Sequence, residues 1–232
     1  MTDTASTIPR TISAVIPTLN EAHSLAGTVT RLNAIPEICE IIVADGGSND
    51  GTEKVAAELG CRVISAPRGR GRQMRQGAAP AGGDVVMLVH ADTWLPPNAG
   101  AAALEVFRER DVVAGGFWKE FRDAPLLVRG CRFKNWLRFE LGRRIMGDQA
   151  MFIRRDVLEK IGGVPDVVLM EEFELCRSLW KVGRMKLASA TVTTSARRFQ
   201  KRGVLRTYAL MWSVMIRYHL GATPDELAKR YR

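Results

Sequence analysis

The sequence contains few of the cysteines that build disulfide or zinc scaffolds. Its 232 residues include four of them, at positions 39, 61, 131 and 176. No two have the short spacing of a zinc finger, and so few cysteines do not make the dense framework of a small secreted domain. A disulfide-stabilised scaffold is therefore excluded, and we expect reduced, buried thiols in a cytoplasmic protein.

Long apolar stretches are also missing. The longest uncharged apolar run near the C-terminus covers residues 207–216, which is about half of the ~20 residues that a membrane-spanning helix needs. Residues 1–11 are polar and contain no apolar signal core. We therefore expect a protein that is soluble, or peripheral on the inner face of the membrane, and not integral.

Acidic residues are too few to balance the basic ones. The chain has 34 Lys and Arg against 25 Asp and Glu, a net charge of +9, and residues 197–232 hold nine of the basic and two of the acidic residues. This excess favours a phosphate-rich partner, such as a nucleotide diphosphate or an anionic membrane, although a merely solvated basic surface is the alternative. No aromatic residue interleaves with the Arg/Gly segment at 68–77, so nucleic acid is not an expected partner.

The pattern of apolar residues predicts an α/β fold. Short apolar segments at 12–16, 40–44, 61–65 and 85–89 read as strands, and they alternate with helical segments at 21–33, 51–59 and 72–80. This alternation is typical of a mainly parallel sheet flanked by helices on both faces. In the second half we expect strands at 112–121, 147–153 and 187–194, and helices at 125–141, 155–161, 171–181 and 203–219.

Three polar segments follow predicted strands, at 17–21, 45–51 and 90–93. Ligands of open α/β sheets bind at the carboxyl ends of the strands, so these segments are candidate binding loops. In the second of them, Asp45 precedes two glycines, which allow the backbone to approach a flat ligand closely. The carboxylate of Asp45 could accept hydrogen bonds from a base or ribose, and an ordinary turn is the equal alternative.

Acidic residues elsewhere suggest metal and proton chemistry. His90 and Asp92 follow an apolar strand with a spacing that places both side chains on one side, where they could ligate Mg²⁺ or Mn²⁺. Glu171 and Glu172 open a predicted helix; one of them could be a general base, or both could simply complement the helix dipole. Asp148 is a second acidic candidate.

Taken together and in order, these segments resemble family 2 glycosyltransferases, which have the GT-A fold. The likeness covers roughly residues 12–200. The matching segments are 15–21 (VIPTLNE), 41–52 (IIVADGGSNDGT), the Arg/Gly segment, 90–92 (HAD), 147–149 (GDQ), 154–163 (RRDVLEKIGG) and the pair at 171–172. The nearest subgroup is a short bacterial "transferase 2" type found beside radical-SAM and selenium-domain proteins, which this chain resembles in HADT, GDQ and RRF (197–199).

The resemblance implies an inverting glycosyltransferase with one GT-A domain over residues 1–232. A nucleotide-sugar and metal half would cover 12–100, an acceptor and catalytic half 101–200, and a C-terminal helix 201–232. The implied binding residues for the nucleotide sugar are Pro17, Thr18, Asn20, Glu21, Asp45, Gly47, Arg72, Ala91, Gln149 and Arg198. Asp92 and His90 would hold Mn²⁺ or Mg²⁺, and the base would be Glu172, with Glu171 and Asp148 as the other candidates.

Two positions depart from the pattern of many relatives. His90 replaces the first Asp of a D-x-D metal motif, and Glu171-Glu172 replaces a Glu-Asp pair. The Q-x-x-R-W signature of processive synthases is absent, so transfer of a single sugar is favoured over polymerisation.

The expected partners are a nucleotide-sugar donor, with a UDP-sugar favoured, and a small-molecule or lipid-linked acceptor. Basic and aromatic residues alternate over 129–144 and in the last predicted helix. Such segments either lie on an anionic bilayer or pack on the core or a second subunit as a homodimer. The rival functions are a nucleotidyltransferase on a similar fold and a non-catalytic polyanion binder.

Overall fold

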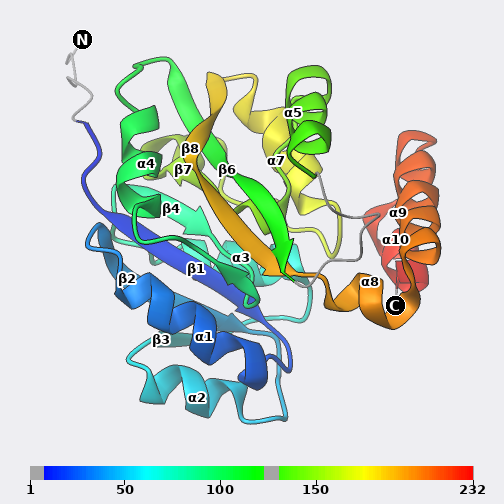
Figure 1. Cartoon of the computed structure of the whole chain (residues 1–232), viewed down its shortest axis with the longest axis horizontal. Helices are drawn as coiled ribbons and strands as arrows, with labels where there is room; N and C mark the ends of the chain where they lie inside the picture. The colour runs from blue at the N-terminus through cyan, green and yellow to red at the C-terminus, as the bar shows by residue number, and fades with distance from the viewer. Residues whose placement is uncertain (1–7, 123–130, 232) are drawn as a thin grey trace.

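Figure 1 shows the computed structural model of the protein, which describes the backbone of residues 8–122 and 131–231. The first half alternates strands and helices, as predicted. Its elements are β1 (Ile12–Thr18), α1 (Ala22–Asn33), β2 (Ile38–Asp45), α2 (Thr52–Glu58), β3 (Arg62–Ser65), α3 (Arg70–Ala78), β4 (Val85–Leu88), β5 (Thr93–Trp94) and α4 (Ala99–Val106).

The second half contains longer strands and ends in helices. Its elements are β6 (Val112–Arg122), α5 (Cys131–Gly142), a 3-10 turn (Gly147–Gln149), β7 (Met151–Arg154), α6 (Arg155–Lys160), α7 (Glu171–Leu179), β8 (Arg184–Ser195), α8 (Arg197–Arg202), α9 (Val204–His219) and α10 (Pro224–Tyr231).

The strands form one eight-stranded sheet in the order β3-β2-β1-β4-β7-β6-β8-β5. Strands β1 to β4 are paired in parallel, and β6 pairs in parallel with β8. The strand β7 runs antiparallel between β4 and β6, and β5 runs antiparallel to β8. The sheet is therefore mixed but mainly parallel, with helices on both faces, which is the predicted α/β architecture.

Two apolar clusters hold the layers together, one on each face of the sheet. On one face α1, α2 and α4 bury residues such as Leu25, Ala56 and Ala103 against β1, β2 and β4. On the other face α3, α6 and α7 bury residues such as Met74 and Leu175. Because the side chains of one strand alternate between the faces, β1 contributes Ile16 to the first cluster and its neighbour in sequence to the second.

The C-terminal helices pack at one end of the sheet rather than on its faces (Figure 1). Val214 of α9 and Leu227 of α10 form a small apolar cluster with Leu169 and Met170, which precede α7. In the described part of the chain, none of the helices is both long enough and apolar enough to cross a bilayer.

Several predicted boundaries are wrong. The expected strand over 147–153 starts with a 3-10 turn, and β7 begins after Ala150, whose backbone is left-handed (φ 45°). The expected final helix has a separate helix, α8, before it, because Gly203 (φ 78°) interrupts the chain. The alanine-rich α4 and the terminal α10 were missed. The expected helix over 125–141 is described only from Cys131, since residues 123–130 lie outside the described part.

Candidate active site

The loop after β2 is held together by the carboxylate of Asp45. One oxygen accepts hydrogen bonds from the hydroxyls of Thr18 (2.9 Å) and Ser48 (2.5 Å), and the other accepts from the backbone of Gly47 (2.9 Å) and Ser48 (2.7 Å). Burial acts to raise the pKa of Asp45, but these hydrogen bonds outweigh it and hold the pKa below its ordinary value of 3.8. Asp45 is fully buried, so in this conformation it shapes the loop and offers no free oxygen to a ligand.

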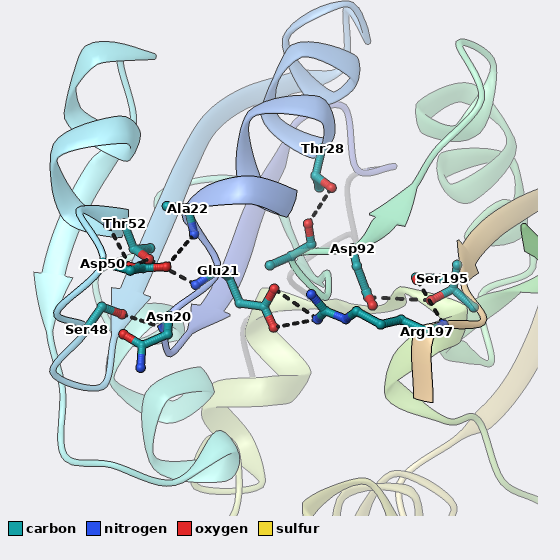
Figure 2. Close-up of polar contacts among 12 residues, drawn as sticks. Asn20, Glu21, Ala22, Thr28, Ser48, Asp50, Thr52, Asp92, Ser195 and Arg197 are labelled. Atoms are coloured by element: carbon teal, nitrogen blue, oxygen red, sulfur yellow. Dashed lines mark hydrogen bonds and ion pairs between the residues drawn. The ribbon is translucent and has the colours of Figure 1, made fainter. Parts of the chain in front are cut away.

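The segment after β1 is fastened to the same loop (Figure 2). Asn20 has a left-handed backbone (φ 57°); its N–H donates to Ser48 Oγ (2.8 Å), and its side-chain oxygen accepts from the N–H of Asn49 (2.9 Å). The next two backbone N–H groups donate to Thr52 Oγ1 (3.0 Å) and Asp50 Oδ2 (3.1 Å). The first two predicted binding loops therefore form one unit at the carboxyl edge of the sheet.

Gln73, which was not among the predicted site residues, connects the two loops. Its side-chain nitrogen donates to the carbonyl oxygens of Thr18 (2.5 Å) and Ala44 (3.1 Å), and its amide packs next to Gly46. The neighbouring Arg72, predicted to bind the nucleotide, is partly exposed and forms an ion pair with Asp166 (3.3 Å).

Asp92 lies at the opposite wall of the site, beside β8 and α8. Its side chain accepts a hydrogen bond from Thr194 Oγ1 (3.5 Å), and its carbonyl oxygen accepts one from Arg122 (2.9 Å). Burial and the charge of Glu21 raise the pKa of Asp92, while Arg197 and Arg122 act against this rise. Asp92 is therefore only partly buried.

Glu21 and Arg197 join the two walls. One guanidinium nitrogen of Arg197 donates to both carboxylate oxygens of Glu21, at 3.1 and 3.2 Å (Figure 2). Arg197 begins α8, so this ion pair links the loop after β1 to the C-terminal helices. Glu21 was predicted to bind the donor, but its contact with Arg197 was not predicted.

The two acids that open α7 share one arginine. Arg70 at the start of α3 contacts Glu171 through Nε and Glu172 through Nη2 (2.9 Å). Glu172 also accepts a hydrogen bond from the backbone of Gly147 (3.2 Å). Burial raises the pKa of Glu172, and Glu171 adds to the rise, although Arg70 opposes it. The raised pKa makes Glu172 a stronger base than an exposed glutamate.

His90 turns toward this acid pair. A methyl group placed on Gly147 would overlap His90 Nε2 and come within 2.7 Å of Glu172 Oε1, so these atoms are close neighbours. Among the described residues, Nε2 of His90 has no hydrogen-bond partner. Burial, followed by the charge of Arg70, lowers the pKa of His90 to about 4, so its imidazole is neutral at pH 7.

Asp148 interacts with several charged groups of the site. Lys119 of β6 forms an ion pair with its Oδ2 (2.5 Å), while Oδ1 is buried and lacks a partner among the described residues. Burial acts to raise the pKa of Asp148, but the charge and hydrogen bond of Lys119, together with the charges of Arg138 and His90, outweigh it and keep the pKa below its ordinary value. The charge of Asp148 acts in turn on His90, Asp92 and Arg198, so these groups lie near one another.

Gln149 does not have the predicted ligand-binding role in this conformation. Its side-chain nitrogen donates to the carbonyl of Phe117 (3.0 Å), and its oxygen accepts from the N–H of Met146 (3.1 Å). The amide is buried and holds the 3-10 turn that presents Asp148. Ala91 is likewise buried, with its carbonyl oxygen bound by the hydroxyl of Thr28 (2.6 Å).

The other predicted donor residues lie around the same edge. Pro17 and Thr18 end β1, and Gly47 is exposed with a left-handed backbone (φ 88°). Burial and the charges of Arg70 and Arg202 lower the pKa of Arg198, while Asp92 and Asp148 act against this, so this arginine lies near the same acids.

The site contains several side chains that could ligate a divalent cation. Within residues 8–122 and 131–231, no three His, Cys, Asp or Glu side chains form a closed metal site. Asp92 is partly buried, and Asp148 Oδ1 and His90 Nε2 are buried without partners in this part of the chain. These donors fit a cation that takes one or two protein ligands and completes its shell with phosphate and water. Nε2 of His90 lies next to Gly147 and Glu172, and the pairing of His90 with Asp92 as metal ligands stays a prediction.

Comparison with known sequences supports the resemblance. A sequence model of glycosyl transferase family 2 matches residues 13–162, well over half of the chain. The glycosyltransferase YaiP of Escherichia coli (strain K12) is 32% identical over 193 residues, which cover 72% of this chain and 47% of YaiP. The dolichol-phosphate mannosyltransferase of Pyrococcus furiosus is 28% identical over 165 residues, covering 68% of this chain and 44% of that protein. The chain thus spans about half the length of these relatives.

Solved structures share the fold. The mannosyltransferase PcManGT of Pyrobaculum calidifontis, in complex with GDP-Man and Mn²⁺, has a TM-score of 0.63 at 20% identity, covering 81% of this chain and 57% of its own. S. aureus TarS in complex with UDP has a TM-score of 0.67 at 15% identity, covering 80% and 60%. The GT-A fold predicted from the sequence is therefore confirmed. With the family match over residues 13–162, these findings establish that the chain belongs to glycosyl transferase family 2.

Proposed function

We propose that the protein is an inverting, metal-assisted glycosyltransferase that moves one sugar from a nucleotide-diphosphate sugar to an acceptor hydroxyl. The observation that carries the proposal is the gathering of Asp92, Asp148 and Glu172 at the carboxyl edge of the sheet, where the charge of Asp148 acts on both Asp92 and His90, and that of Glu172 also acts on His90. Family membership supports the activity, and a fold neighbour bound to GDP-Man and Mn²⁺ supports the donor class and the metal.

The donor would bind along the fastened loops of the N-terminal half. Asn20 and Glu21 hold the wall next to the loop that Asp45 shapes, so we assign contacts with base and ribose to the exposed parts of these loops. Gly47 has no side chain to block a flat ring, and its backbone needs the left-handed conformation that glycine adopts readily. A UDP-sugar stays the favoured donor, and Arg72 and Arg198 are positioned for negatively charged groups.

The metal would be held by Asp92 together with the donor's phosphates. A bound Mn²⁺ or Mg²⁺ would neutralise negative charge on the departing diphosphate. Asp92 meets this need because it is only partly buried and its carboxylate accepts one long hydrogen bond, of 3.5 Å, from Thr194. His90 would be a minor ligand at most, since its Nε2 faces Glu172.

Glu172 would be the general base. It would take the proton of the acceptor hydroxyl as that oxygen attacks the anomeric carbon from the face opposite the departing diphosphate, which inverts the configuration. In this structure Arg70 contacts the carboxylate, and acceptor binding would have to share or displace that contact. Glu171 would keep Arg70 in place, because it binds the same guanidinium through Nε.

The remaining organisation is part of the same proposal. Residues 12–100 would form the donor half, 101–200 the acceptor half and 201–232 a helical extension of one domain. The acceptor would be a small molecule or a lipid-linked one, the enzyme would touch the membrane only peripherally, and two copies could form a homodimer. Membership of the radical-SAM-associated subgroup rests on the HADT, GDQ and RRF segments.

The function is tested by thermal shift with a panel of UDP-, GDP- and dTDP-sugars, each with and without Mn²⁺. A ligand that binds only the native state raises the melting temperature in proportion to the logarithm of its concentration above Kd. The expected result is stabilisation by one nucleotide class that requires Mn²⁺ and is lost in Asp92→Asn. If no nucleotide sugar stabilises the protein under either condition, the proposed function is wrong.

A further inference from the structure

A cavity lies between the C-terminal ends of α5 and α9 and one side of α7, away from the proposed active site. Its volume is about 320 Å³. The lining residues are Gly142, Arg143, Arg144, Phe173, Cys176, Arg177, Trp180, Tyr218 and His219. In Figure 1 these helices lie on the same side of the molecule, away from β3 and α2. The cavity is therefore a separate feature of the C-terminal half.

The lining is basic. It contains three arginines and a histidine, and no acidic side chain is among its residues in the described chain. Arg143 stacks over Trp180 (5.1 Å to the ring centre) and Arg144 over Phe173 (4.4 Å), so aromatic rings hold the two guanidinium groups in place. Arginine groups held in this way are suited to phosphate, which they bind by charge and by paired hydrogen bonds.

Glu174, an acid beside the cavity, already has partners. Glu174 accepts a hydrogen bond from the hydroxyl of Tyr218 and lies 3.9 Å from Arg177. One carboxylate therefore faces several cationic groups, and the cavity keeps an excess of positive charge. A negatively charged ligand would offset this excess.

Exposed leucines flank the cavity on both sides. Leu141 directly precedes Gly142 on α5, and Leu220 directly follows His219 at the end of α9; they are 79% and 80% exposed. Along α9, Leu205, Trp212 and Ile216 are also exposed. Their spacing of seven and four residues places them on one face of the helix, in line with Leu220.

We infer that this cavity binds the phosphate of an anionic lipid headgroup while the flanking leucines and the apolar face of α9 enter the bilayer interface. The combination of a cationic cavity with adjoining exposed apolar residues fits a bilayer surface, where charge and hydrocarbon lie a few ångströms apart. A second copy of the chain fits less well, because each copy carries a net charge of +9 and would bring more positive charge to the cavity. This inference names the partner of the membrane contact within the proposed function, and lipid binding itself requires no nucleotide sugar.

The experiment is flotation of the full chain with vesicles, without nucleotide. One set of vesicles contains phosphatidylcholine alone, and the other contains phosphatidylcholine with phosphatidylglycerol. The protein is expected to float with the anionic vesicles at low salt, and much less at high salt, because exposed charges are screened. Donor binding by thermal shift is measured in parallel, so that failure of lipid binding and failure of the proposed function are recorded separately.

Two double variants test the two parts of the surface. Arg143→Gln with Arg177→Gln removes two cavity charges and should lower binding to anionic vesicles about tenfold or more. Leu141→Ser with Leu220→Ser should lower it by a similar factor by removing the apolar contact. The matched controls are Lys54→Gln with Arg108→Gln, whose side chains are 81% and 70% exposed far from the cavity, and Ile8→Ser, at a site 58% exposed. The controls should float like the wild type.

Each other outcome overturns the inference. Equal flotation with both vesicle types would remove the role of the headgroup's negative charge, because phosphatidylcholine also has a phosphate but no net charge. Variants that float like the wild type would remove the role of this surface. If free glycerol phosphate stabilises the protein and Arg143→Gln with Arg177→Gln abolishes that effect without changing flotation, the cavity is a site for a soluble anion. If the leucine variant changes the molecular mass in solution but not flotation, a second copy covers the face.

Discussion

Both carboxylate oxygens of Glu21 accept hydrogen bonds from a single guanidinium nitrogen of Arg197, at 3.1 and 3.2 Å, across 176 positions of sequence. The pair connects the segment after β1 to the first residue of α8, and it lies next to Asp92 (Figure 2). Exposed ion pairs stabilise proteins by about 0–1 kcal/mol. The contact therefore matters less for stability than for the position of α8 relative to the donor loops.

Arg197→Gln should weaken donor binding and leave the fold intact. We expect the free energy of unfolding to change by less than about 1 kcal/mol, while the Kd for the nucleotide sugar with Mn²⁺ rises several-fold. Two effects act together, because α8 loses its link to Glu21 and Asp92 loses a cation that lowers its pKa. Titration calorimetry measures the Kd, and Arg108→Gln, an exposed arginine paired with Glu105, is the control. An unchanged Kd would show that donor binding does not depend on the ion pair between Glu21 and Arg197.

Glu172→Gln should stop transfer and spare donor binding. The amide keeps the shape of the carboxylate and can still accept the hydrogen bond from Gly147, but it cannot take a proton. The expected loss in kcat is about 10²–10⁴-fold, the usual contribution of a general base. The measurements are the rate of sugar transfer to the acceptor and the Kd for the donor. Glu171→Gln is the matched control in the same acid pair. If Glu172→Gln turns over fully, the base is Glu171 or Asp148.

The pH dependence of transfer follows from the direction of the Glu172 shift. A base works only when ionised, and burial raises the pKa of Glu172 above the ordinary value of 4.5. Activity should therefore fall as the pH drops through this raised pKa, by up to about tenfold per pH unit below it. The profile of kcat/KM against pH measures this, with unfolding followed at each pH to separate the two effects. A profile that stays flat down to pH 4.5 would contradict the assignment.

The first half of the fold could be predicted well from sequence. Strands such as β1 and β4 are mainly apolar runs, so the local pattern predicts their type, although β1 continues through Pro17 to Thr18, two residues beyond its predicted end. The alanine-rich α4 was missed because a run of small residues has weak periodicity. The last helix was predicted at 203–219 and is observed as Val204–His219, whereas the short helix α8 before it was missed.

The candidate site could be predicted by residue type but not by partner. Asp148 and Glu172 stand out as acids, whereas their cationic partners are distant in sequence: Lys119 is 29 residues from Asp148, and Arg70 is 102 residues from Glu172. Asp45 lies at the carboxyl end of β2, as predicted, whereas Gln149 lies in a 3-10 turn instead of the predicted strand, and both side chains bond within the protein. Such an outcome depends on hydrogen-bond geometry, which a single sequence does not contain.

Asp45→Asn should destabilise the protein near neutral pH. An amide nitrogen in place of Oδ2 would face the N–H groups of Gly47 and Ser48, which are donors too, so those groups would lose their acceptor. The expected cost is about 1–3 kcal/mol of unfolding free energy. Since the folded-state pKa of Asp45 is below the ordinary 3.8, its contribution is present above that value and lost as the pH falls through the lower one.

The difference between wild type and Asp45→Asn should therefore shrink below about pH 4, as measured by urea unfolding at several pH values. Asp50→Asn is a control in the same loop, since Asp50 accepts from Thr52 but is exposed. Equal stability of wild type and Asp45→Asn at pH 7 would show that the loop does not depend on this carboxylate.

Gly147→Ala should reduce transfer far more than it reduces stability. The added methyl group would overlap His90 Nε2 and lie 2.7 Å from Glu172 Oε1, so both side chains must move. These atoms are the ends of flexible side chains, which lets the fold adjust, but a displacement of about 1 Å at a catalytic group costs about 10²-fold in rate. The measurements are kcat and the melting temperature. Gly82→Ala is the matched control, because its nearest neighbour, Glu40 Oε1, is at an ordinary 3.5 Å. Full activity in Gly147→Ala would mean that the reaction does not need Glu172 and His90 at their positions in this structure. The base would then be Glu171 or Asp148.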